Sequence, residues 1–161
     1  MIPQAYLRSK QELKSQKVLR ARSFLIKLRT QVKNRIHALV GMQREEIREA
    51  ARGYSDLFGR SGLEWLKGLE LEEPGSKILR ELIEVYENLC GEIVKLDSVV
   101  RRIVGEDPDC QLLKSVPGIG DFFAALIKAE IGDIRRFSSS SKLCSYVGLV
   151  PSTQASGGKV W

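Results

Sequence analysis

The sequence is poor in the residues on which most metal and catalytic sites depend. It holds one histidine, His37, and three cysteines, Cys90, Cys110 and Cys144, at no spacing typical of metal ligands. A zinc site and cysteine–histidine catalysis are therefore disfavoured. A Walker A loop and a dinucleotide fingerprint are also missing. The four consecutive serines at 138–141 are better explained by helix capping and solvation than by catalysis.

Long apolar runs and export signals are missing as well. No segment reaches the roughly 18–20 apolar residues that are needed to cross a membrane. The first residues do not form the basic and then apolar pattern of an export signal. An odd number of cysteines fits a reducing compartment. We therefore expect a cytoplasmic protein with no membrane partner.

What the chain does have is positive charge, gathered in one arm. The net charge is +6, yet residues 1–40 carry ten lysines and arginines against one acid, Glu12, and the remainder carries more acids than bases. Such an arm favours contact with nucleic acid, ahead of an acidic partner or a merely solvated helix face. The predicted phosphate contacts are Lys14, Lys17, Arg20, Arg22, Lys27, Arg29, Lys33 and Arg35.

Hydrophobic periodicity predicts two long helices. The first runs from about residue 9 to 52, with Gly41 as a point of interruption and an apolar stripe at Leu25, Leu28, Val32, Ile36 and Leu39. The second runs from about 76 to 104, with a near-heptad seam at Leu82, Val85, Leu89, Ile93, Leu96, Val100 and Ile103. These helices are expected to form an antiparallel hairpin, although the same seam could instead join two subunits.

The predicted organisation has four parts. A basic long helix occupies residues 1–52, and a connector punctuated by glycine and proline follows at 53–76, with Trp65 as its packing anchor. The second long helix occupies 77–106, and a partial helix-hairpin-helix domain occupies 107–161.

The motif at residues 112–131 is typical of a helix, a tight turn and a second helix. Pro117, Gly118 and Gly120 form the turn, and the second helix begins with its free N–H groups and positive dipole end at that turn. A DNA phosphate would suit this position, although such a turn can also be a simple connection. Asp121 would repel a phosphate there. Asp109 is the expected cap of the preceding helix, and Ser138 or Ser139 the cap of a later one.

Beyond this motif, the chain resembles the C-terminal part of the DEDD-type insertion-sequence transposases of the IS110/IS116/IS902 family. The similarity in order and spacing lies in residues 113–120, 124–126, 130–133, 136–137, 146–151 and 156–158. The basic helix is similar to the linker of these enzymes at 20–22, 28–30 and 33–36.

The resemblance implies a role in DNA transposition in bacteria or archaea. It makes Ser156 the match to the family's nucleophilic serine, with Ser152 and Thr153 as lesser rivals. The family enzyme also has an acidic tetrad that binds Mg²⁺, and some members use a guide RNA. This chain begins where the linker begins and ends after the Ser-Gly-Gly motif. We therefore expect no cofactor within it and no activity from it alone.

Together these observations predict an all-α protein, with a coiled-coil-like antiparallel hairpin followed by a small helix-hairpin-helix domain truncated at its C-terminus. Its expected function is DNA binding within a transposase, with Ser156 supplied to a composite active site. Its expected partners are DNA, a guide RNA and a second copy of the chain. The alternatives are a non-catalytic DNA-binding module and a helical oligomerisation piece.

Overall fold

The computed structural model describes residues 7–149 and the backbone of two short strands at 155–156 and 159–160. The described part is all-α, as expected, apart from these two-residue strands. Its helices are α1 (Lys10–Gly41), α2 (Glu45–Arg52), α3 (Arg60–Gly68), α4 (Gly75–Glu106), α5 (Pro108–Lys114), α6 (Asp121–Ile131), the 3-10 helix η1 (Ile134–Arg136) and α7 (Ser140–Tyr146). The strands are β1 (Ala155–Ser156) and β2 (Lys159–Val160). Two compact units are distinguished, Met1–Glu130 and Ile131–Trp161.

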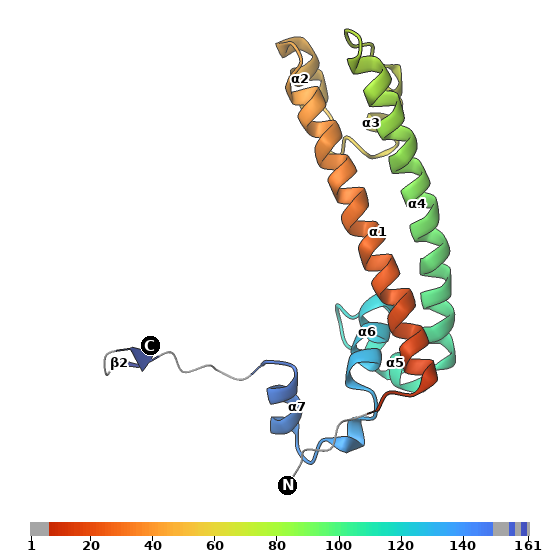
Figure 1. Ribbon diagram of the computed structural model, residues 1–161, viewed down its shortest axis with the longest axis vertical. Helices are drawn as coiled ribbons and strands as arrows, with labels where there is room; N and C mark the ends of the chain where they lie inside the picture. The colour runs from red at the N-terminus through yellow and green to blue at the C-terminus, as the bar shows by residue number, and fades with distance from the viewer. Residues whose placement is uncertain (1–6, 150–154, 157–158, 161) are drawn as a thin grey trace. The chain divides into compact units, whose positions relative to one another are not determined.

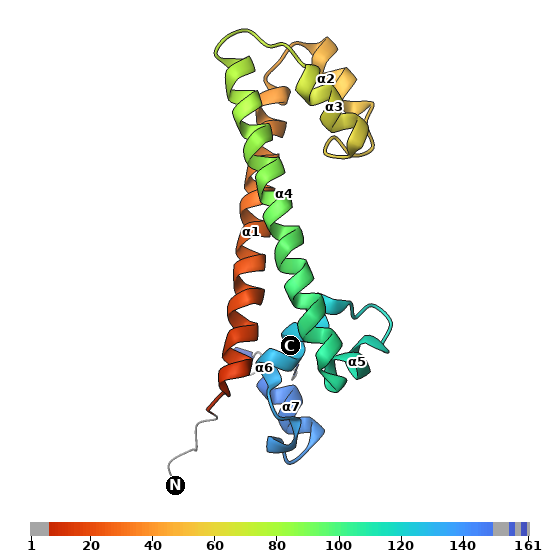
Figure 2. The same ribbon diagram turned by 90° about the vertical axis from the view of Figure 1, so that its right-hand side faces the viewer.

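The first unit is built on a long antiparallel hairpin. α1 and α4 run side by side in opposite directions in both views (Figures 1 and 2). A capping box starts α1: the Ser9 hydroxyl accepts from the Glu12 N–H at 3.2 Å, and the Glu12 carboxylate accepts from the Ser9 N–H at 2.5 Å. α1 ends at Gly41, where the sequence predicted an interruption. The predicted antiparallel hairpin is confirmed.

The hairpin has a hydrophobic cluster at each end. The cluster at the tip joins α1, the connector and the start of α4, and its buried members are Ile36, Val40, Leu57, Phe58, Leu66, Leu79, Ile83 and Tyr86. The cluster at the base joins α1, the end of α4, α5 and α6, and its buried members are Leu19, Val100, Val104, Cys110, Ala124, Ala125 and Ala129. Between them, the hairpin is only two helices thick.

The predicted seams were partly correct. On α1, Ile36 is buried, and Val32 and Leu39 of the predicted stripe pack against the tip cluster. On α4 the buried side chains are Leu79, Ile83, Tyr86, Ile93, Val100 and Val104, of which only Ile93 and Val100 were predicted. Leu82 of the predicted seam packs against the tip cluster, whereas Val85 is 46% exposed. The apolar stripe on α4 is wide, and successive residues are turned by about 100°, so the pattern alone does not select the buried flank.

Two capping predictions have different outcomes. Asp107 caps α5, because its carboxylate accepts from the N–H groups of Asp109 and Cys110, so Asp109 was the wrong residue. Ser139 caps α7 as expected, by accepting from the Lys142 N–H. At the C-terminal end, β1 pairs with β2 in an antiparallel arrangement, which the predicted all-α class did not include.

The second unit has a small aromatic centre of its own. The Arg136 guanidinium lies 4.2 Å from the Phe137 ring centroid and 4.5 Å from that of Tyr146. Arg136 also donates from Nε to the Ile131 carbonyl at 3.1 Å. These contacts tie η1 to α7, because one cation contacts rings from both sides of the intervening turn.

Candidate nucleic-acid interface

The outward face of α1 carries cations that the protein does not neutralise. Lys14, Lys17, Lys27 and Arg35 are exposed and have no ion-pair partner among the described residues. Arg20 is also exposed, with 72% of its side chain accessible, and lies 4.0 Å from Glu130. Lys17 and Arg35 are separated by about 27 Å at the α-helical rise of about 1.5 Å per residue. We call these five residues the outward basic face.

The other three predicted contacts face the protein. Arg22 forms an ion pair with Asp97 of α4, and its guanidinium lies 4.5 Å from the Phe122 ring centroid. Lys33 lies 4.5 Å from the Phe58 ring centroid, and the half-buried Arg29 is close enough to Tyr86 to act on its pKa. Burial of Tyr86, together with a hydrogen bond involving Cys90, outweighs the effect of the Arg29 charge. The pKa of Tyr86 is therefore raised to about 12. These three cations support packing.

An exposed aromatic ring interrupts the outward basic face, and sequence reasoning missed it. Phe24 is 59% exposed, four residues after Arg20 and three before Lys27, so the three share one side of the helix. Cations alternating with an aromatic ring are typical of surfaces that bind single-stranded nucleic acid. The spacing of Arg20, Phe24 and Lys27 in the sequence could have placed this ring on the same side of the helix as the two cations.

The helix-hairpin-helix motif is formed by α5, a tight turn and α6. Gly118 takes a φ of +90°, which a side chain would oppose, whereas Gly120 is not in this region. A Cβ at either position would meet nothing within 4 Å, so the turn is open to solvent on this side. Both predicted glycines therefore lie at the exposed turn, and only Gly118 is required by backbone conformation.

The positive end of α6 already has an anion beside it. Asp121 lies in the first turn of α6, and its carboxylate is 2.7 Å from the Lys114 ammonium at the end of α5. Asp121 complements the helix dipole, and Lys114 neutralises Asp121. A phosphate arriving at this turn would compete with a carboxylate that is part of the protein.

The motif is firmly attached to the base of the long hairpin. Gln16 of α1 donates to the Ala129 carbonyl of α6 at 3.2 Å, and the Arg8 guanidinium contacts Glu130 through its carbonyl at 3.2 Å and its carboxylate at 2.9 Å. Cys110 is fully buried, and burial followed by the charge of Asp107 raises the pKa of its thiol to about 11. This cysteine is a packing residue.

A second ion pair joins the two helices of the motif. Lys128 of α6 forms a hydrogen bond with Asp109 of α5, which raises the pKa of Lys128 despite partial burial. The lysine therefore stays charged, and the pair holds α6 against α5 on the side opposite to the turn's exposed edge.

The predicted nucleophile is placed by its backbone alone. Ser156 ends β1 and lies opposite Lys159 of β2 in the antiparallel register. Ser152 and Thr153 lie outside the described residues. Within the described part of the chain, no group of three or more histidine, cysteine or acidic side chains could hold a metal ion. No helix described there is long and apolar enough to span a membrane.

Comparison with known proteins identifies the family that this chain resembles. Residues 110–161 match the model of the transposase IS116/IS110/IS902 family. The chain is 29% identical to a "Probable family 20 transposase" of Pseudomonas aeruginosa over 95% of its length. It is 29% identical over 89% of its length to the transposase for insertion sequence element IS1111A of Coxiella burnetii.

Residues 110–161 therefore resemble the IS116/IS110/IS902 transposase family, and most of the chain is similar to known transposases. The comparisons support its interpretation as a C-terminal part of such a transposase. It spans 45% of the Pseudomonas relative and 39% of the Coxiella relative. No solved structure is significantly similar to it. The family match begins at Cys110, so it includes the helix-hairpin-helix motif and Ser156 and leaves out the outward basic face.

Exchange of Asp121 tests whether the turn between α5 and α6 holds a phosphate. If a phosphate contacts the start of α6, Asp121→Asn should tighten DNA binding about two- to fivefold, because a negative charge is removed from that helix end. The measurement is a fluorescence anisotropy titration with duplex DNA at constant salt. Glu106→Gln removes an equal charge at the exposed end of α4, where no ion pair with a described residue is lost, and serves as the control. Equal affinities of the two variants would contradict phosphate binding at the turn.

Proposed function

We propose that this chain binds DNA in the course of transposition, with the outward basic face of α1 as its main contact. The observation that carries the proposal is the exposure of Lys14, Lys17, Lys27 and Arg35 without an ion-pair partner in the described part of the chain. Unneutralised cations release counterions from DNA when they meet its phosphates, which supplies binding free energy. Similarity to transposases supports DNA as the polyanion.

The proposed chemical role is that of Ser156 in the complete enzyme. Its hydroxyl oxygen would bond to a DNA phosphorus while the bond from that phosphorus to a deoxyribose oxygen breaks, which leaves a serine-linked strand. Support comes from the position of Ser156 within the family match and at the end of a paired strand. A guide RNA is a further proposed partner.

Mg²⁺ enters this proposal only as a cofactor bound by another part of the full-length enzyme. The described residues bring together no three metal-ligating side chains, so they do not fit the ion. The metal would be held by the acidic tetrad expected in the full-length enzyme.

Removal of charge from the outward basic face tests the proposed DNA contact. The double variant Lys17→Gln, Lys27→Gln should weaken DNA binding. It should also make the plot of log affinity against log salt less steep by about 2, because two phosphate contacts are lost and each contributes about 0.9 to the steepness. Titrations at four salt concentrations measure the slope. Lys77→Gln with Arg101→Gln removes two exposed charges from α4 as a control. An unchanged slope in the α1 variant would refute the contact.

A covalent adduct tests the role of Ser156. Incubation of the chain and a separately supplied acidic-tetrad domain with labelled DNA should give a protein–DNA band that resists denaturation. Ser156→Ala should abolish this band, and Ser152→Ala should keep it. A band that survives Ser156→Ala would assign the nucleophile elsewhere. DNA binding with no band in any protein would favour the non-catalytic DNA-binding module.

A second copy of the chain is proposed as a partner because part of α4's apolar stripe stays uncovered. Leu89, Leu96 and Ile103 are only half-buried, and Val85 is exposed. They follow one flank of α4 at spacings of four and seven residues. α1 covers the neighbouring flank. The same flank of a second hairpin would remove this apolar surface from water.

Two charges on this flank test the pairing of hairpins. Leu89→Glu with Leu96→Glu should convert a dimer to a monomer, because four carboxylates would meet in one interface. Sedimentation velocity measures the molecular mass, and circular dichroism checks that the helices persist. Val94→Glu, on the opposite flank and already 61% exposed, is the control. A wild-type monomer at high protein concentration would contradict the proposal.

A further inference from the structure

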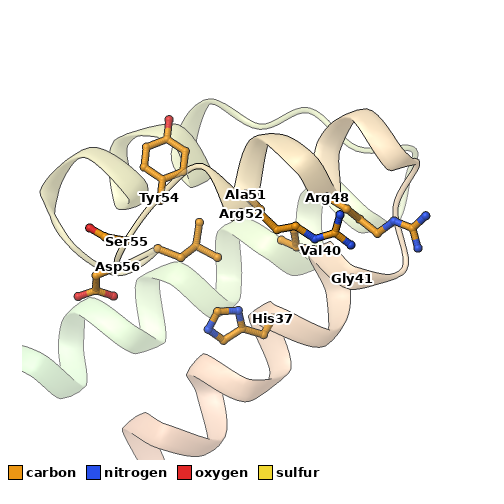
Figure 3. Close-up of a pocket in the computed structure, with 10 residues that line it drawn as sticks. His37, Val40, Gly41, Arg48, Ala51, Arg52, Tyr54, Ser55 and Asp56 are labelled. Atoms are coloured by element: carbon orange, nitrogen blue, oxygen red, sulfur yellow. The ribbon is translucent and has the colours of Figure 1, made fainter.

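A pocket at the tip of the hairpin has no role in the proposed function. It lies between the end of α1, α2 and the segment that follows α2, and has a volume of about 380 Å³ (Figure 3). Its polar lining residues are His37, Arg48, Arg52, Tyr54, Ser55 and Asp56. Ligand pockets in proteins usually begin at about 300 Å³, so one small ligand fits.

One end of the pocket is cationic and already organised. Arg48 and Arg52 both bond to the carboxylate of Glu45, which does not line the pocket, and the Arg52 distance is 3.0 Å. The side chains of Arg48 and Arg52 are nevertheless 40% and 68% accessible, so part of each guanidinium reaches solvent. Two guanidinium groups held by one carboxylate therefore present spare donors to an anionic group such as a phosphate.

The opposite end is an acceptor. Asp56 lies there in Figure 3, across the pocket from Arg48 and Arg52. Its Oδ1 accepts from the Phe58 N–H at 2.9 Å, and Oδ2 has no donor among the described residues. A free carboxylate oxygen beside a bound one suits a ligand edge with adjacent N–H donors.

The floor between the two ends is partly aromatic. His37 projects from α1 toward the segment of Ser55 and Asp56 in Figure 3, and its ring meets the edge of Phe58 with centroids 5.2 Å apart. Val40 and Leu57 add apolar surface. A flat ring can lie on such a floor, since aromatic and apolar groups both favour its faces.

We propose that this pocket binds a guanine nucleotide, with its phosphate at Arg48 and Arg52 and its base edge at Asp56. Guanine has two adjacent donors, N1–H and the N2 amino group, which match a carboxylate. Adenine has an acceptor at N1 and would meet Asp56 with a repulsive contact. The nucleotide could be free or an unpaired guanosine in a nucleic acid strand, because both offer the same groups. The pocket is separate from the outward basic face and does not depend on it.

The test is a calorimetric titration of the 161-residue chain with guanosine 5′-monophosphate, adenosine 5′-monophosphate and inorganic phosphate. The guanine nucleotide should bind at least about tenfold more tightly than either, as expected for one added charge-assisted hydrogen bond. Arg52→Gln should weaken guanosine 5′-monophosphate about tenfold or more. Asp56→Asn, which can still accept from Phe58, should abolish the preference over adenine. Arg60→Gln, outside the pocket and paired with Glu64, should change nothing.

Two further experiments identify the source of the ligand and distinguish failure of the pocket from failure of the α1 contact. A single-stranded tetramer with one guanine that binds more tightly than the mononucleotide would assign the site to nucleic acid, and the reverse order would assign it to the free nucleotide. Lys17→Gln with Lys27→Gln should leave the mononucleotide titration unchanged, so failure of the α1 contact would not be mistaken for failure of the pocket. Equal affinities for guanine, adenine and phosphate, or no binding, would overturn the proposal.

Discussion

The structure depends on the packing of α1 against α4, which is strong at the two ends of the hairpin and thin between them. Two hydrophobic clusters fix the ends, and the middle is held by Ile93 and by the ion pair between Arg22 and Asp97. A two-helix layer can bury only one stripe of each helix. The remaining surface of α1 therefore stays open to solvent, and the cations on it are available to a partner.

That open surface has an electrostatic cost within the free protein. The outward basic face repeats like charges along one helix with few acids nearby, since Glu12 is the single acid of the first 40 residues. Like charges on a helix repel each other. A polyanion lying along α1 would relieve this repulsion, so binding and helix stability should reinforce each other through linkage. The charge distribution is thus better suited to the bound state than to the free state.

The sequence predicted the helices and their antiparallel arrangement, but it could not say which way individual side chains face. The stripe on α4 is wide enough that Val85 and Leu79 are both apolar candidates for the core, yet Leu79 is buried and Val85 is exposed. Arg22 and Lys17 look alike in the sequence as well. Long basic side chains can pack their stems against apolar surface, so charge alone does not place them outside.

The helix-hairpin-helix motif illustrates why a motif does not fix its own role. In isolation, the free N–H groups at the start of α6 predict a phosphate. In the structure, Lys114 and Asp121 satisfy that end internally, and three small alanines pack α6 closely against the base of the hairpin. A motif neutralised and packed in this way is better suited to hold the chain that follows it than to attract DNA. We therefore infer that phosphate affinity resides mainly on α1, where Lys14, Lys17, Lys27 and Arg35 have no ion-pair partner among the described residues.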